Sequence, residues 1–161
     1  MNERLAAALR RNTARGMLPE FLATTSAALG RRIEESDLIP LEESDKILRA
    51  FEGRMKEQSL GGKAKFVDEI LDDDVALVRQ AAALRETIPD EEMALFRSGS
   101  KWCGAIQSTA HEVLSHLTKL VSPDQEDVIA CSGNQSLGIF CSLDSRKGEE
   151  SPVYHLILWS D

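Results

Sequence analysis

The sequence predicts an α+β fold in which an N-terminal helical half packs on a small, mostly antiparallel sheet. Apolar residues recur at helical spacing up to residue 88, whereas most apolar runs after residue 92 are short and strand-like. The expected units are a helical half over residues 1–88 and a strand, helix and three-strand meander over residues 89–161. A chain of 161 residues with 42% apolar residues has the usual size of one domain, so both parts are expected to pack as one globular unit.

Short helices are expected throughout the first half. One begins around Leu5 and Leu9, and Pro19 suits the first turn of a second helix that stops at Gly30. Further helices are expected around residues 48–55 and 66–71, and the aspartates at 72–74 can cap another over residues 75–84. Residues 72–89 resemble one helix of a HEAT-type repeat, but no second copy recurs at the repeat period of about 40 residues.

The second half predicts a sheet with one long helix. Strands are expected at residues 93–96, 127–132, 136–143 and 152–159, and a helix is expected over residues 100–121. The last strand is apolar on both faces, so each face of the sheet needs a cover. The helix at 103–121 is expected to cover one face and the N-terminal helices the other.

Acidic residues are concentrated in a few segments of a chain whose formal net charge is −8. This charge opposes binding to nucleic acid phosphates or anionic lipid and suits a basic partner. The candidate contacts lie in residues 34–45 and 68–74, and a third acidic run follows Pro89. The alternative interpretation is that these acids are solvated helix faces or helix starts. The candidate partner-binding residues are Glu34, Glu35, Glu42, Glu43, Asp45, Asp72, Asp73 and Asp74.

In size, charge and expected compartment the chain resembles the small immunity and antitoxin proteins that cover the basic active site of a nuclease-type toxin. The resemblance is one of class, since no motif carries it. It implies a protein-binding module without catalysis, with a basic protein such as a toxin as its partner. A helix-rich regulator or a secretion chaperone fits the same composition.

Cys103 and His155 support an alternative hypothesis, a small thiol hydrolase. Trp102-Cys103-Gly104 followed by a histidine in a later strand resembles papain-type thiol hydrolases in outline, which implies Cys103 as nucleophile and His155 as base. The chain departs from that family because no asparagine or aspartate follows the histidine in a strand. His111 is excluded as the base, because it falls on the opposite side of the expected helix and should be solvent-exposed. The competing interpretation is that Cys103 packs as a small apolar residue.

No cofactor or metal is predicted. Three cysteines in irregular spacing lack the close pair that zinc sites use, and the loop at residues 97–101 lacks a complete phosphate-binding motif. Reduced thiols and the lack of a secretory or membrane-spanning segment predict a cytoplasmic location. The oligomeric state and the strand order stay open.

Overall fold

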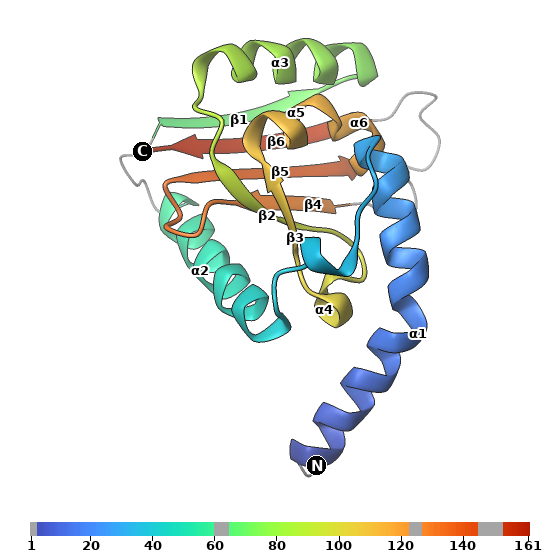
Figure 1. Ribbon diagram of the computed structural model, residues 1–161. Coiled ribbons are helices and arrows are strands. Elements are labelled where there is room, and N and C mark those ends of the chain that lie inside the picture. The colour runs from blue at the N-terminus through green and yellow to red at the C-terminus, as the bar shows by residue number, and fades with distance from the viewer. Residues whose placement is uncertain (1–2, 60–64, 123–126, 145–152) are drawn as a thin grey trace.

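A six-stranded antiparallel sheet organises the chain (Figure 1). The computed structural model describes residues 3–59, 65–122, 127–144 and 153–161. The strands are β1 (Lys65–Leu71), β2 (Glu92–Phe96), β3 (Ile106–Thr109), β4 (Asp127–Cys131), β5 (Leu137–Asp144) and β6 (Val153–Ser160). Their order across the sheet is β1-β6-β5-β4-β2-β3, so β1 and β3 are the edge strands. The predicted α+β class is confirmed.

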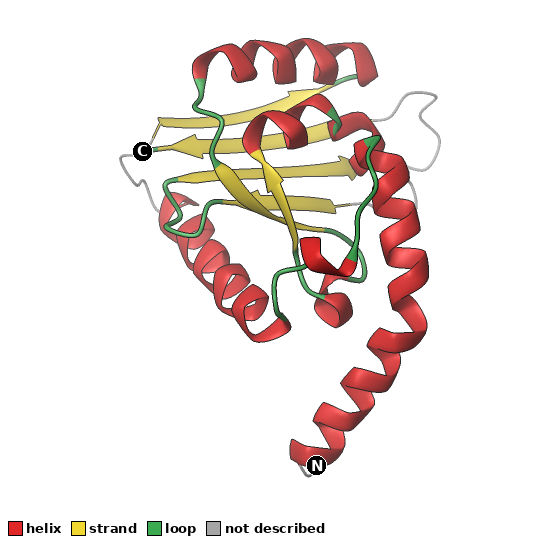
Figure 2. Cartoon of the chain, viewed as in Figure 1, coloured by secondary structure: helices red, strands yellow, loops and turns green. Residues whose placement is uncertain are grey.

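Helices cover both faces of this sheet (Figure 2). In chain order they are α1 (Glu3–Leu29), the 3-10 helix η1 (Glu35–Asp37), α2 (Leu41–Ser59), α3 (Asp74–Thr87), α4 (Ser100–Cys103), α5 (Ala110–Ser115) and α6 (Leu117–Leu120). The C-terminal part of α1 packs with α3, α5 and α6 on one face, which we call the four-helix face. Helix α2 covers the other, the α2 face. The expected division of the covers was therefore wrong for α1 and α3, which lie on the same side as α5 and α6. No helix among the described residues is long and apolar enough to cross a bilayer.

The strands expected near residues 93, 127, 136 and 152 are all present, and β4, β5 and β6 form the predicted meander. Side chains in a strand alternate between faces, and β6 shows both sets buried. Tyr154 and Leu156 belong to the four-helix face, whereas Ile157 and Trp159 pack under α2. This arrangement explains why the last strand is apolar throughout.

Two expectations for the first half were wrong. Helix α1 is continuous through Pro19, where a new helix was expected to start. Proline removes one backbone hydrogen bond, and Arg15 and Pro19 are both exposed, so water can satisfy the carbonyl that is released. Residues 66–71 form part of β1 and not a helix, because the run pairs along its whole length with β6. In this strand Val67 and Leu71 pack against the core, and Ile70 on the opposite face is 67% exposed.

The long helix expected at residues 100–121 is also wrong. The segment contains α4, the strand β3, and the short helices α5 and α6. Gly104 ends α4 with a φ of 94°, and a Cβ there would lie 2.3 Å from the carbonyl oxygen of Ile39. Residues 106–109, which follow this bend, pair with β2. Val113 and Leu117 are nevertheless buried, as the helical pattern predicted. His111 is half-buried, not exposed, because its Nε2 atom lies 3.0 Å from the carbonyl oxygen of Ile88.

Trp159 is the central side chain of the core under α2. It is fully buried, its ring centroid lies 5.0 Å from that of Phe51, and its Nε1–H donates to the carbonyl oxygen of Gln135 at 3.1 Å. Gly138 is the residue opposite Trp159 in the β5–β6 register. A Cβ at Gly138 would lie 2.0 Å from the Trp159 ring, so the indole occupies the space that any larger residue would need.

We therefore expect Gly138→Ala to lower the free energy of unfolding by at least about 2 kcal/mol, since an added methyl group must displace a buried ring. Chemical denaturation followed by tryptophan fluorescence measures this change. Gly53→Ala is the matched control, because a Cβ there meets nothing within 4 Å in an exposed turn of α2. It should raise the free energy of unfolding by up to about 1 kcal/mol. Equal effects of the two substitutions would contradict the packing argument.

Candidate functional site

A groove of about 690 Å³ opens at the β3 edge of the sheet. Its walls come from the segment around η1, the first turns of α2, strands β2 and β3, and α5. Four acidic residues line it, Asp37, Glu43, Glu92 and Glu112, together with one cationic residue, Arg31. We call this site the acidic groove.

The buried hydroxyl of Ser44 holds the two walls together. Its Oγ donates to the carbonyl oxygen of Ile39 at 3.0 Å and accepts from the backbone N–H of Ala105 at 2.8 Å. The N–H of Ile39 in turn donates to the carbonyl oxygen of Ala105 at 2.8 Å, and Leu38 forms a bridge with Ile106. These contacts fix η1 and the start of α2 against β3, which places Asp37 and Glu43 beside the residues of β2 and α5.

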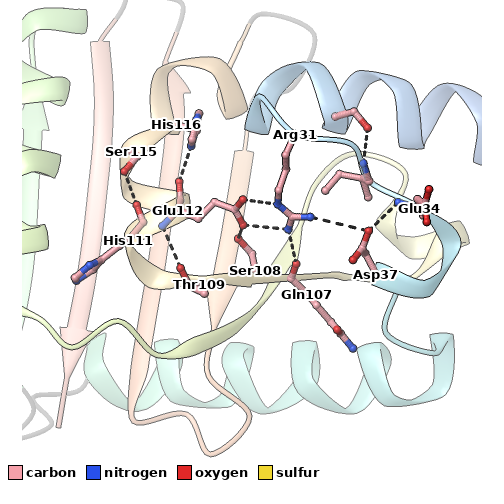
Figure 3. A network of polar contacts seen from close by, with 12 residues as sticks. Arg31, Glu34, Asp37, Gln107, Ser108, Thr109, His111, Glu112, Ser115 and His116 are labelled. Carbon is pink, nitrogen blue, oxygen red and sulfur yellow. Dashed lines mark hydrogen bonds and ion pairs between the residues drawn. The ribbon is translucent and has the colours of Figure 1, made fainter.

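Arg31 and Glu112 form the polar centre of the groove (Figure 3). The Nε and Nη2 atoms of Arg31 lie 2.5 Å and 3.1 Å from the two carboxylate oxygens of Glu112, and Nη2 also donates to the carbonyl oxygen of Gln107 at 3.0 Å. The hydroxyl of Ser108 donates to Glu112 Oε2 at 2.6 Å. Asp37 is farther away, with its Oδ2 atom 4.0 Å from Arg31 Nη1. A bidentate pair of this kind fixes both side chains in position.

The ionisation of Glu112 reflects these contacts. Burial opposes its charged form, but the hydrogen bonds from Arg31 and Ser108 outweigh burial and lower the pKa of Glu112 below its ordinary value. The same pair raises the pKa of Arg31, whose hydrogen bond to Glu112 outweighs the effect of burial. Both groups are therefore charged at neutral pH, and Glu112 neutralises Arg31.

Glu43 and Glu92 differ from Glu112 because no described residue neutralises them. Both side chains are exposed, one on α2 and one on β2, and neither forms a hydrogen bond or ion pair within the described part of the chain. Asp37 differs from both, because it accepts from the backbone N–H of Glu34 at 2.8 Å and forms a longer ion pair with Arg31 at 4.0 Å. Ile39, Ile47, Met93 and Ala94 also line the groove and make part of its wall apolar. The groove thus combines unneutralised carboxylates with an apolar surface.

The other predicted contacts in residues 34–45 have structural partners or lie outside the groove. Glu34 belongs to the capping box of η1 and pairs with Arg32 at 2.9 Å, and Glu35 is exposed within η1. Glu42 is exposed in the first turn of α2. Asp45 accepts two hydrogen bonds from Arg10, both 3.0 Å long, so its charge is already used to hold α1 against α2.

The predicted contacts at residues 72–74 lie at the N-terminal end of α3, a helix on the opposite face of the sheet from α2. Asp73 is the N-cap of α3 and accepts from the N–H of Ala76 at 2.7 Å. Asp74 accepts a hydrogen bond from the buried Tyr154 hydroxyl, and Asp72 is exposed beside them. The structure therefore does not bring the two predicted acidic segments into one surface.

Cys103 and His155 are not brought together either. Cys103 packs at the margin of the core on the four-helix face, and it ends α4 where the sequence suggested a helix start. His155 alternates with Tyr154 and Leu156 and so lies on the α2 face, where its Nε2 atom is 2.5 Å from Asp68 Oδ1. Burial raises the pKa of the Cys103 thiol, which is the opposite of an activated nucleophile.

Cys131 lies under α2 and Cys141 lies on the four-helix face, so the two thiols point to opposite sides of the sheet. Among the described residues, no three His, Cys, Asp or Glu side chains are grouped so that they could hold a metal ion.

Comparisons with protein-family models, with curated proteins and with solved structures each gave no match to the chain.

Replacing Glu112 should change stability in a pH-dependent way. Because its pKa is lowered on folding from an ordinary value of 4.5, its stabilising contribution is complete above that pH and is lost as the pH falls through the lower folded value. We expect Glu112→Gln to lower the free energy of unfolding at pH 7 by about 1–2 kcal/mol. The difference from the unmodified protein should shrink below pH 4.5. Urea denaturation across this pH range tests this, with Glu20→Gln at an exposed position of α1 as the unaffected control.

Thiol reactivity should follow burial. Burial raises the pKa of Cys131 to about 11 and that of Cys141 to about 12, so neither should react with Ellman's reagent near neutral pH until the protein unfolds. Cys103 should react in the native state, but more slowly than a small free thiol. Cys103→Ser should remove this native reaction. Rapid modification of Cys103 at neutral pH would instead favour the thiol hydrolase.

Proposed function

We propose that the protein is a binding module that engages a basic protein partner through the acidic groove, as an inhibitor of the immunity or antitoxin type. The observation that carries the proposal is the pair of exposed carboxylates, Glu43 and Glu92, that line one groove without a neutralising partner among the described residues. A nuclease-type toxin is the partner class that the charge suits best, because its nucleic acid site must itself be basic.

The chemistry of the groove fits a lysine or arginine side chain. The methylene groups of such a side chain can pack against Ile39, Ile47 and Met93, while its charged end reaches the carboxylates. Arg31 shows that the groove already accepts a guanidinium group, which it binds bidentately at Glu112. Glu43 and Glu92 supply the remaining negative charge for a group from outside.

Electrostatics of this kind mainly accelerates association and selects partners. Charge complementarity raises the rate of encounter and rejects acidic competitors, whereas affinity depends on a few well-packed contacts. The net charge of −8 acts at long range, and the groove supplies the local contacts. Binding should therefore weaken as the salt concentration rises.

We expect Glu43→Lys combined with Glu92→Lys to weaken partner binding at least about tenfold, which corresponds to about 1.4 kcal/mol. The partner is captured from the source organism at low salt and its affinity is then measured by calorimetry. Asp72→Lys with Glu86→Lys makes the same change in net charge at exposed positions near α3 and is the matched control. Equal weakening by both variants would show that net charge, not the groove, binds the partner.

The inhibitor role needs its own measurement. A captured nuclease should lose activity when the unmodified protein is added and should keep it when the Glu43→Lys, Glu92→Lys variant is added at the same concentration. A partner whose activity is unchanged by the unmodified protein would contradict the inhibitor role.

A further inference from the structure

The N-terminal part of α1 runs past α4 and projects beyond the sheet (Figure 1). Between residues 4 and 20 no side chain of this helix is buried, and Phe21 is the first one that is. We call residues 4–18 the arm. Because α1 is continuous from Glu3 to Leu29, the arm keeps the direction set by the part of the helix that packs on the sheet.

The arm has an apolar side that no described residue covers. Leu5 and Leu9 are 54% and 52% exposed, and residues four apart lie on the same side of a helix. Arg10 lies about 100–140° around the helix from the two leucines and contacts the molecule. It binds Asp45 and donates to the carbonyl oxygen of Lys101 at 2.8 Å. The leucine pair therefore points away from the chain to which the arm belongs.

The charge of the arm is opposite to that of the acidic groove. The first fifteen residues contain four arginines and one glutamate in a chain whose net charge is −8. Arg11 and Arg15 are exposed and lie one helical turn apart. Neither forms an ion pair with any described residue. Their guanidinium groups and the leucine pair offer the two kinds of contact that the groove can accept.

We infer that the arm of one copy of the chain docks in the acidic groove of a second copy, with Arg11 and Arg15 on Glu43 and Glu92 and with Leu5 and Leu9 on the apolar wall. This inference rests on the proposed function, because it uses the same groove and supplies a basic segment for it. The arm cannot enter the groove of its own chain, since the helix is unbroken and Arg10 ties it to Asp45. Mutual exchange of arms closes a two-fold dimer.

Self-association is measured by sedimentation velocity between about 5 and 200 μM, a range in which a modest dimer affinity is visible. We expect the unmodified chain to form dimers that dissociate as salt is raised. Arg11→Glu with Arg15→Glu, Leu5→Asp with Leu9→Asp, and Glu43→Lys with Glu92→Lys should each weaken the dimer at least about tenfold. Val75→Asp with Val78→Asp is the matched control, because these residues of α3 are 64% and 55% exposed and lie outside both surfaces. Circular dichroism verifies that each variant is folded.

Mixing two variants gives the sharpest test. The arm-reversed variant has an acidic arm and an acidic groove, and the groove-reversed variant has a basic arm and a basic groove, so each should be monomeric alone. Their mixture should form a heterodimer, because both arms then meet a groove of opposite charge. A monomeric unmodified chain, an unchanged dimer in the arm or groove variants, or a mixture that stays monomeric would each overturn the inference.

An oligoarginine peptide separates this inference from the proposed function. If the unmodified chain is monomeric but binds the peptide, and Glu43→Lys with Glu92→Lys abolishes that binding, the arm inference fails and the groove remains a site for basic segments. If the peptide does not bind at all, the proposed function fails as well.

Discussion

The hydroxyl of Ser44 is the contact on which the geometry of the site depends. It joins the carbonyl oxygen of Ile39 to the N–H of Ala105, two backbone groups that are far apart in the sequence and would otherwise be buried without partners. Gly104 makes the approach possible, because a side chain there would collide with the Ile39 carbonyl. An unsatisfied buried polar group costs about 1–3 kcal/mol, so the hydrogen bonds of Ser44 and the bend at Gly104 stabilise each other. Together they place the start of α2 beside β3 and so form the groove.

The acidic residues then divide into those that stabilise the fold and those that remain available. Asp73 and Asp74 hold the N-terminus of α3, Asp45 holds α1, and Glu112 neutralises Arg31. A carboxylate with a fixed partner inside the chain has little to offer a second molecule, since binding would first have to break that contact. Glu43 and Glu92 line the groove and have no such partner among the described residues. The local environment of each acid, and not the local density of acids in the sequence, therefore indicates which of them can bind.

Sequence periodicity predicted the strands of the meander and the residues of the core, but not β1 or β3. Ile106 falls in phase with Val113 and Leu117, so a helix fits the pattern as well as a strand does, and pairing with β2 decides the outcome. Of the residues that line the candidate site, Glu43 was among the contacts predicted from the acidic run at residues 34–45. The contact of Arg31 with Glu112 joins residues 81 positions apart and leaves no local signal. The sequence does not show to which face of the sheet Cys103 and His155 point, because this depends on the strand register. The two residues therefore looked like a pair.

The continuity of α1 through Pro19 fixes the direction of the basic arm relative to the acidic groove. A break at Pro19 would let the arm move freely, and its leucines could then fold back onto the molecule. The unbroken helix keeps Leu5 and Leu9 exposed, and the contact between Arg10 and Asp45 fixes the same direction from the side. A segment that is already ordered loses less conformational entropy when it binds. Asp45, predicted as a contact for a partner, thus contributes indirectly, because it orients the basic arm that the acidic groove of a second copy can accept.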